Sequence, residues 1–166
     1  LDGDVFIIRT APDDPDVIYV CEWDYQAIFY SSDGGSERWQ SRTCRYDIQD
    51  LAVEGEGDVS YVIKASDGEV SKSSNSGFTW GSSEDTGLDD GWSITSVGED
   101  MLLAGSEDGY VSYSTDGGDS WEDLDGDLGT HAVATASGLD DGDWIYAAGW
   151  DDGELYRWEI GEDDDW

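Results

Sequence analysis

Basic side chains are scarce in this sequence. It contains 7 Lys and Arg residues against 41 Asp and Glu residues, which gives a formal net charge of -34. Binding to double-stranded nucleic acid or to an anionic membrane surface requires Lys and Arg side chains that displace counterions. No apolar run approaches the roughly 18 residues that a membrane-spanning helix needs. We therefore expect no nucleic-acid partner and no insertion into a membrane.

Residues of common catalytic and metal-binding motifs are also few. The chain has 2 Cys and 1 His, and it contains no GxSxG, HExxH or phosphate-binding loop. Two cysteines are too few for a disulfide framework or a zinc knuckle. The single histidine, His131, opens a predicted strand, where we expect it to lie in the core or along a channel. The sequence thus predicts no cofactor and no catalytic residue.

Acidic and aromatic residues are abundant instead. A high net charge with modest hydrophobic content usually indicates disorder, but the chain also has 9 Trp, 9 Tyr and 3 Phe residues, enough for a folded core. Self-repulsion of an acidic surface is largely screened at about 1 M salt, where the Debye length is about 3 Å. The composition is therefore typical of a protein from a halophile. An acidic calcium-binding or phosphate-mimicking protein is the alternative.

Three short segments of similar sequence recur along the chain. They read SSDGGSERW at 31–39, SSNSGFTW at 73–80 and STDGGDSW at 114–121, and their closing tryptophans are 41 residues apart. The preceding residues align too, as IYVCEWDYQAIFYSSDGG (18–35), SYVIKASDGEVSKSSNSG (60–77) and MLLAGSEDGYVSYSTDGG (101–118). A weaker fourth copy reads WIYAAGWDDGELYRWEIG (144–161). Such a fixed period indicates a tandem repeat.

Each repeat contains four strand signals, here called A to D in chain order. Runs rich in Val, Ile, Tyr and Trp alternate with polar residues and are separated by Gly, Asp and Ser clusters. The A strands are predicted at 5–10, 46–53, 92–97 and 131–136, the B strands at 17–22, 60–64, 101–105 and 144–149, and the C strands at 27–31, 69–73, 110–114 and 154–158. The D strands begin near the three closing tryptophans.

Four short antiparallel strands in a repeat of about 40 to 45 residues are typical of a β-propeller blade. The predicted fold is therefore all-β, a propeller of about four four-stranded antiparallel blades with the last one incomplete. We expect one domain over residues 1–166, with approximate blades at 1–44, 45–86, 87–127 and 128–166.

The recurring segment resembles the Asp-box, or BNR repeat, of sialidase-like propellers, which has the pattern S-x-D-x-G-x-T/S-W. The third copy matches fully, the second has Asn in place of Asp, and the first has one residue inserted before the Trp. The matching residues are Ser31, Asp33, Gly35 and Trp39; Ser73, Asn75, Gly77, Thr79 and Trp80; and Ser114, Asp116, Gly118, Ser120 and Trp121. The resemblance implies a structural hairpin between strands C and D, away from any catalytic face. Asp, Asn, Ser and Gly suit such a turn.

The last repeat departs from this pattern. Trp158 and Ile160 stand where the third copy has Ser114 and Asp116, and no D strand is predicted after them. Strand C of the last blade should therefore be a bare edge, and exposed edges recruit partners. Three explanations stay open. The chain is part of a larger propeller, it pairs with another copy or another protein through its edges, or it forms an open or four-bladed ring with a ragged end.

The resemblance to sialidases does not extend to their catalytic residues. That family uses an arginine triad, a Tyr–Glu nucleophile pair, an Asp acid/base and a Phe-Arg-Ile-Pro motif, to which VFIIRTAP at 5–12 is only faintly similar. Carboxylate pairs suited to glycoside cleavage occur by chance in so acidic a chain. A fragment of a sialidase-like glycoside hydrolase, with its catalytic residues outside this chain, is the alternative to a non-catalytic propeller.

The sequence offers one weak candidate for a metal site, Asp123, Asp125 and Asp127. Its Gly comes too early for a calcium-binding EF-hand loop, and no Glu stands at the twelfth position. Cys21 and Cys44 fall on strands B and D of the first repeat, about 9–10 Å apart with strand C between them. That distance exceeds the reach of a disulfide, so we expect two free or buried thiols.

Propellers bind ligands at the loops between strands B and C and between D and A. On this rim we expect the side chains of Trp23, Tyr25, Arg42, Arg45 and Trp150. Aromatic faces suit sugar rings and arginines suit carboxylates, so the hypothesis is that the rim recognises a glycan or an acidic protein loop. The alternative is that the arginines pair with nearby carboxylates and the aromatic rings pack between blades.

The most consistent interpretation is a non-catalytic propeller that acts as a scaffold or binding module at high salt. Its expected partner is a protein or a second copy, bound at the exposed edge of the last blade, and a glycan is the alternative ligand. We expect an extracellular, cell-surface or virion location in a high-salt organism rather than a cytoplasmic one.

Overall fold

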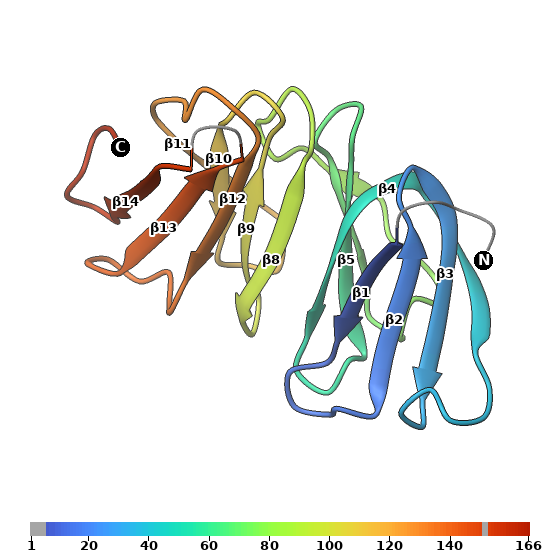
Figure 1. Cartoon of the computed structure of the whole chain (residues 1–166). Helices are drawn as coiled ribbons and strands as arrows, with labels where there is room; N and C mark the ends of the chain where they lie inside the picture. Colours follow the sequence, from blue (N-terminus) through green and yellow to red (C-terminus); the bar gives the residue numbers. More distant parts are fainter. Residues whose placement is uncertain (1–5, 151–152) are drawn as a thin grey trace.

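A computed structural model describes residues 6–150 and 153–166, and all regular structure in them is β-strand (Figure 1). The first two repeats form β1 (Phe6–Thr10), β2 (Val17–Glu22), β3 (Tyr25–Ser32), β4 (Gln40–Glu54), β5 (Val59–Lys64), β6 (Val70–Ser73) and β7 (Ser83–Glu84). The last two form β8 (Ser93–Gly98), β9 (Met101–Gly105), β10 (Val111–Ser114), β11 (Glu122–Leu124), β12 (Ala132–Ala136), β13 (Trp144–Gly149) and β14 (Leu155–Glu159). Within these residues, no helix is long and apolar enough to cross a membrane.

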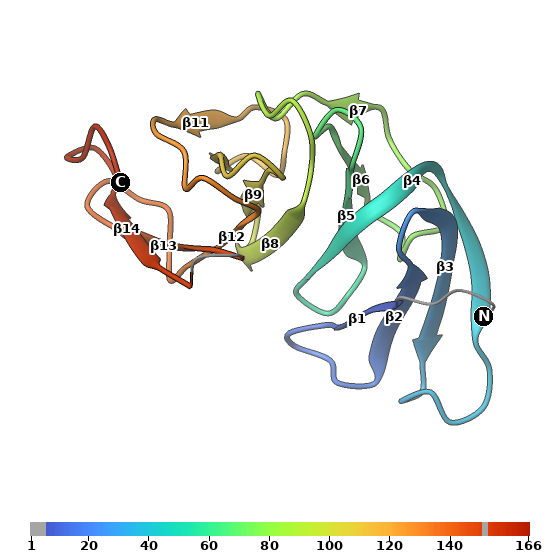
Figure 2. The same ribbon diagram turned by 45° about the horizontal axis from the view of Figure 1, so that its top comes forward.

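The strands form three sheets in which every neighbouring pair is antiparallel. The first sheet has the order β1-β2-β3-β4-β5-β6-β7, the second β11-β10-β9-β8 and the third β12-β13-β14. Figures 1 and 2 show the sheets side by side around an arc, with the first repeat at one end and β13 and β14 at the other. The prediction of an all-β fold of curled antiparallel sheets is confirmed.

Strand β4 differs from the prediction, because the D strand of the first repeat and the A strand of the second are one continuous strand of 15 residues. Its first part pairs with β3, from Gln40 opposite Tyr30 to Thr43 opposite Ala27. Its second part pairs with β5, ending with Glu54 opposite Val59. The segment has no Gly or Pro to interrupt it, whereas glycines stand between β7 and β8 and between β11 and β12. The first two repeats therefore share one sheet.

The core consists of three layers, each lying between consecutive repeats. Alternate residues of a strand point to opposite faces of its sheet, so an inner strand supplies two layers at once. In β5, Val62 packs in the first layer, while Tyr61 and Ile63 pack in the second. In β9, Leu102 packs in the second layer and Leu103 in the third. Both faces of the inner sheets are thus buried.

The pairing of strands B and C corrects the sequence alignment of the repeats. Residues Ile18, Ser60, Leu102 and Ile145 occupy the same structural position, since they lie opposite Ser31, Ser73, Ser114 and Trp158, respectively. The alignment had placed Met101 and Trp144 there, one residue too early. In the third repeat the reason is a B–C connection shorter by one residue. A shift by one residue moves each side chain to the other face of the sheet. The corrected register therefore decides which residues of the four repeats lie on equivalent faces of their sheets.

Candidate functional site

Three C–D hairpins share one hydrogen-bond pattern at the lower end of the blades in Figure 1. The first serine of each box accepts a backbone N–H four residues on, at 2.9 Å in all three: Gly35 to Ser31, Gly77 to Ser73 and Gly118 to Ser114. Each serine hydroxyl also donates to the Asp or Asn two residues on, namely Asp33, Asn75 and Asp116. The Asp and Asn side chains also accept hydrogen bonds from backbone N–H groups further along the hairpin.

The carboxylate oxygens of Asp33 and Asp116 accept hydrogen bonds from within their own turns. The Ser31 hydroxyl and three backbone N–H groups lower the pKa of Asp33, and hydrogen bonds led by those from Ser120 lower that of Asp116. In each hairpin the indole ring lies against the glycine of the box, so that a Cβ on Gly35 would approach Trp39 to 3.1 Å. A low pKa and saturated acceptors suit a structural carboxylate rather than a proton donor.

Each box hairpin is also fixed to the A–B turn of its own repeat. The carbonyl oxygens of Asp16, Asp58 and Asp100 accept N–H groups from Gly34, Ser76 and Gly117 at 2.7–2.9 Å. In the fourth repeat Trp158 replaces the serine and is buried in the third core layer beside Trp166, at a ring distance of 5.6 Å. The serine hydrogen bonds are lost there, but the link to the A–B turn remains, because the N–H of Ile160 donates to the Asp143 carbonyl at 2.9 Å.

The opposite end of the blades carries the B–C turns, where the structure places four of the five rim candidates. Trp23 donates its indole N–H to Oε1 of Gln49 at 2.6 Å. Tyr25 is exposed. Arg45 lines a cavity of about 260 Å³ together with Asp24, Gln26 and Lys64, among others. In this first repeat the rim therefore offers mixed charge beside two aromatic rings.

Arg42 does not belong to this rim, which corrects the sequence-based expectation. Arg42 lies opposite Ile28 within the β3–β4 ladder, whereas Arg45 falls where that ladder shifts register, between Thr43 and Ile48. The Arg42 guanidinium lies 3.9 Å from the centre of the Tyr30 ring and 5.0 Å from that of Phe78. Burial lowers its pKa, and its Nε and Nη1 atoms are buried without a hydrogen-bond partner. Arg42 thus stacks on aromatic rings near the second box and donates from Nη2 to Oε1 of Gln40 at 2.9 Å; it forms no ion pair within residues 6–150 and 153–166.

Trp150, the fifth candidate, belongs to an aromatic cluster at the same end of the later repeats. Its ring lies 6.2 Å from that of Trp92, which lies 4.2 Å from the ring of His131. The backbone N–H of Trp150 donates to the His131 carbonyl at 3.0 Å. Nε2 of His131 lies 3.5 Å from Oε1 of Glu107. Trp150 itself is 69% exposed, so this cluster presents an open indole face.

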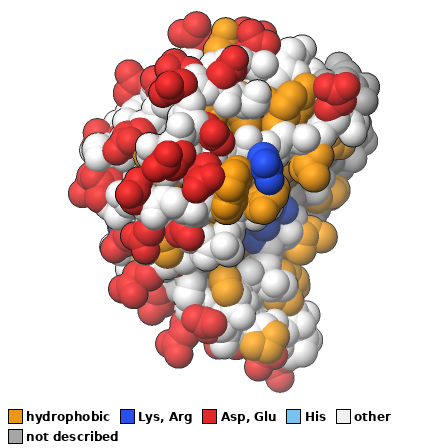
Figure 3. All heavy atoms as spheres, turned by 90° about the vertical axis from the view of Figure 1, so that its left-hand side faces the viewer, with side chains coloured by type: hydrophobic (Ala, Val, Ile, Leu, Met, Phe, Trp, Pro, Cys, Tyr) orange, Lys and Arg blue, Asp and Glu red, His pale blue; other side chains and the backbone are white. Residues whose placement is uncertain are grey.

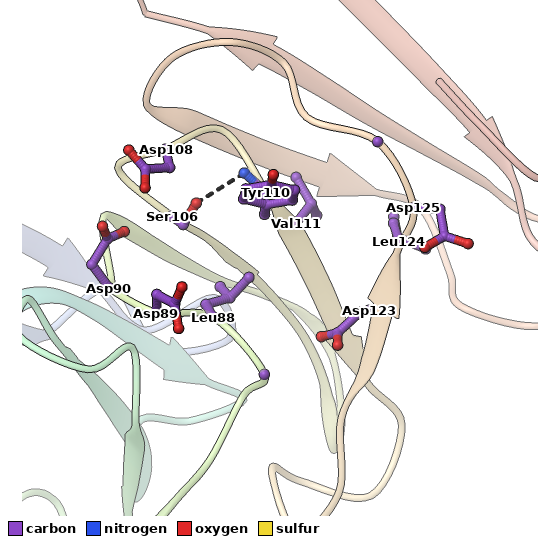
Figure 4. Close-up of a pocket in the computed structure, with 12 residues that line it drawn as sticks. Leu88, Asp89, Asp90, Ser106, Asp108, Tyr110, Val111, Asp123, Leu124 and Asp125 are labelled. Atoms are coloured by element: carbon purple, nitrogen blue, oxygen red, sulfur yellow. Dashed lines mark hydrogen bonds between the residues drawn. The ribbon is translucent and has the colours of Figure 1, made fainter.

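An acid-lined pocket of about 320 Å³ lies where the loops after β7 and β11 meet the β9–β10 turn (Figure 4). Leu88, Val111 and Tyr110 supply apolar surface. Five aspartates line the pocket: Asp89, Asp90, Asp108, Asp123 and Asp125. In Figure 4, Leu88 and Tyr110 lie in the middle of the pocket. Asp89, Asp90 and Asp108 lie on one side of them, and Asp123 lies on the other side. Among the described residues that line this pocket, none is a lysine or an arginine.

The charge in the pocket is partly uncompensated. The pKa of Asp123 is raised, first by burial and then by the carboxylates of Asp85 and Asp125. Neighbouring like charges disfavour the ionised form, and a cation placed among them would reverse that effect. The pocket is therefore suited to a positively charged group.

The three aspartates proposed from the sequence as a weak metal site, Asp123, Asp125 and Asp127, do not come together in the structure. Asp123 and Asp125 line the pocket, but Asp127 accepts the backbone N–H of Gly129 at 2.9 Å as part of a turn. In residues 6–150 and 153–166, no three His, Cys, Asp or Glu side chains are grouped so that they could hold a metal ion.

Glu107 joins the pocket to the aromatic cluster. Its backbone N–H donates to Oδ1 of Asp90, a pocket residue, at 2.7 Å, while its side chain approaches His131. The aromatic cluster and the acidic pocket therefore form one continuous surface, here called the acidic–aromatic surface. It is defined by Trp92, Glu107, His131 and Trp150 together with the pocket aspartates. Sequence reasoning missed Trp92 and Glu107, although Trp92 and His131 both open predicted A strands.

Comparison with solved structures places the fold among the propellers. YCF48 from Cyanidioschyzon merolae superposes with a TM-score of 0.65 at 19% identity, over 96% of this chain and 53% of that one. A structure of YCF48 bound to D1 peptide gives a TM-score of 0.63 at 16% identity, over 100% and 58%. The GH74 enzyme of Niastella koreensis gives 0.66 at 17% identity, over 93% and 23%.

These similarities establish the fold alone. The chain has a β-propeller fold, and it spans about half the length of the YCF48 structures and about a quarter of that of the GH74 enzyme. The sequence matches no protein-family model and no curated protein. Assignment to the Asp-box family therefore stays a prediction, and so does the halophilic origin.

Proposed function

We propose that this chain is a non-catalytic binding module that holds a segment of a partner protein on the acidic–aromatic surface. The observation that carries the proposal is the continuity between the two parts of that surface through Glu107. An extended peptide with a Lys or Arg side chain next to an apolar or aromatic residue fits it, because the cation meets the aspartates and the ring meets Trp150. A propeller of the same fold binds a peptide in the YCF48 complex.

This proposal differs from the acidic ligand expected from the sequence. That expectation required Arg42 and Arg45 on one rim, and Arg42 lies elsewhere, stacked on Tyr30. The surface that remains is dominated by carboxylates, which repel an acidic loop and attract a basic one. At molar salt only close, partly buried charge pairs keep much of their strength, so the contact with the indole must supply part of the affinity.

The test is a selection of peptides from a random library at 1 M KCl, followed by calorimetric titration of the selected sequences. Enrichment of Lys or Arg beside an aromatic residue is expected. Asp108→Asn/Asp123→Asn and Trp150→Ala should each weaken binding at least about tenfold. The control, Glu56→Gln/Glu99→Gln, removes two exposed carboxylates at the opposite end of the blades and should leave the affinity unchanged. Enrichment of acidic peptides, or equal affinity of all variants, would refute the proposal.

A glycan ligand and a role as part of a glycoside hydrolase remain as alternatives. A glycan ligand would bind through Trp23, Tyr25 or Trp150, and its affinity would not depend on Asp108 and Asp123. A segment of a glycoside hydrolase would share the fold of the GH74 neighbours, but similarity at this level of identity carries no activity. Partner docking along the β14 edge also stays a prediction.

A further inference from the structure

The two ends of the arc expose sheet faces that are built like the buried faces between repeats. In the corrected register, Leu155 of the last repeat is equivalent to Ile28, Val70 and Val111. All four lie opposite the same position of strand B, which is occupied by Ala148 for Leu155 and by Cys21, Ile63 and Gly105 for the others, respectively. The three equivalents are 0–3% exposed, whereas Leu155 is 75% exposed.

A second residue on the same face shows the same contrast. Tyr146 is equivalent to Tyr19, Tyr61 and Leu103, each of which is 0–1% exposed and belongs to a core layer. Tyr146 itself is 43% exposed. Figure 3 looks onto this end of the molecule and shows apolar side chains gathered around Lys or Arg side chains, with acidic residues crowding one side of the view. The last repeat therefore presents an apolar face without a covering sheet.

The first repeat presents the complementary face. Ile8 is equivalent to Leu51, Ile94 and Ala134, because all four lie opposite the same position of strand B. That position is Val20 for Ile8, and it is Val62, Ala104 and Ala147 for the others, respectively. The equivalents are 0–4% exposed, while Ile8 is 60% exposed. Phe6, also exposed, continues the same face of β1.

An ion pair between inner repeats indicates what would join these two faces. Lys72, just before the second box, binds Oδ1 of Asp100 in the A–B turn of the next repeat at 3.0 Å. Arg157 occupies the position of Lys72, since it precedes Trp158. Asp16 occupies the position of Asp100, since both carbonyls accept an N–H from the box of their own repeat. Arg157 and Asp16 are thus the two halves of an equivalent pair, at opposite ends of one chain.

We infer that the last-sheet face of one molecule docks on the first-sheet face of a second copy, with Arg157 against Asp16. The occupant is a second copy because this one chain carries both faces and both charges. In a ring of two copies this contact occurs twice, each time between the last-sheet face of one copy and the first-sheet face of the other. The contact is head to tail and therefore heterologous, unlike pairing along the β14 edge.

The test is the mass of the particle at 2 M KCl, measured by light scattering on wild type and on two face variants, Leu155→Asp and Ile8→Asp. Wild type is expected at twice the mass of one chain. In either variant alone, every contact includes one altered face, so each variant should shift to the monomer. The two variants mixed should form a mixed dimer, because the intact first face of L155D meets the intact last face of I8D.

Two further variants keep the result interpretable. Phe78→Asp introduces the same charge at an exposed apolar residue outside both faces and should remain dimeric. Arg157→Asp should weaken the dimer at least about tenfold, and Asp16→Arg in the same chain should restore it. Circular dichroism would confirm that each variant is folded. A monomeric wild type, or a folded I8D variant that stays dimeric alone, would overturn the inference.

Discussion

Arg9 and Asp50 form an ion pair that joins the first strands of two repeats, with Nη2 of Arg9 2.6 Å from Oδ1 of Asp50. The other carboxylate oxygen accepts the backbone N–H of Ile94 at 3.0 Å. Residues 9, 50 and 94 lie on β1, β4 and β8, so one carboxylate connects three repeats. Burial raises the pKa of Asp50, and the Arg9 charge opposes that rise.

The first prediction concerns this carboxylate. Asp50→Ala should lower the free energy of unfolding by about 2–4 kcal/mol, because it orphans the buried N–H of Ile94 and leaves Arg9 unpaired. Asp50→Asn should cost less, about 1–2 kcal/mol, because one acceptor remains. Urea unfolding at 2 M KCl measures both, with Asp47→Ala as an exposed control on the same strand. An equal cost for Asp47→Ala and Asp50→Ala would contradict the prediction.

The pH dependence follows from the same group. A carboxyl group whose pKa is raised in the folded state favours folding below its ordinary pKa of about 4, and this contribution is lost as the pH rises through the raised value. Stability of wild type relative to Asp50→Asn should therefore fall as the pH increases from about 4 to 7. A difference that stays constant across this range would show that Asp50 titrates normally.

The second prediction compares two serines of the third box. Ser114 is buried and accepts the N–H groups of Gly118 and Asp116, whereas Ser120 is exposed. Ser114→Ala should cost about 1–3 kcal/mol, because a buried N–H loses its acceptor. Ser120→Ala should cost less than about 1 kcal/mol. Thermal unfolding of the two variants measures the difference, and a reversed order would exclude the proposed role of the first serine.

The third prediction concerns the cysteines, which are both free and buried. Burial raises the pKa of Cys21 to about 12, and burial also raises that of Cys44. Since the thiolate is the reactive form, labelling of the native protein at pH 8 should be at least about a thousandfold slower than that of the unfolded chain. Stopped-flow reaction with a disulfide reagent measures both rates. Rapid labelling of the folded protein would show that the first core layer opens readily.

The fourth prediction concerns salt. With a net charge of -34, self-repulsion disfavours the compact state, and raising KCl from about 0.1 M to 2 M shortens the Debye length from about 10 Å to below about 3 Å. The unfolding midpoint should rise by about 5 °C or more. Sucrose of matched water activity serves as the control for effects other than screening. A midpoint that sucrose raises as much as KCl does would argue against adaptation to high salt.

The local structure was largely predictable. The strand cores at 17–22, 101–105 and 144–149 were predicted with the bounds that β2, β9 and β13 have. Alternating apolar residues and Gly-Asp turns act over a few residues, so they are readable without the rest of the fold. The hydrogen bonds of the boxes follow from residues within one turn, which explains why the quoted segments pointed to the right hairpins.

The candidate site was predicted only in part. Trp150 was expected on a rim and lies there, but Trp92 and Glu107, which complete its surroundings, come from other repeats. Arg42 was assigned to the wrong end of the blade, because its place depends on the pairing of β4 with β3 and on its contacts with Tyr30 and Phe78, which the sequence did not show. The one-residue error in the repeat alignment assigned Met101 and Trp144 to the wrong face of the sheet.

The sequence by itself determined the strands, the hairpins between them and their repetition, because these depend on side chains a few positions apart. Only the tertiary structure decided which face each residue covers, which carboxylates meet in the pocket beside Trp92, and which apolar faces stay open at Ile8 and Leu155. Those properties depend on how whole sheets pack on one another, and no segment of the chain carries that information alone.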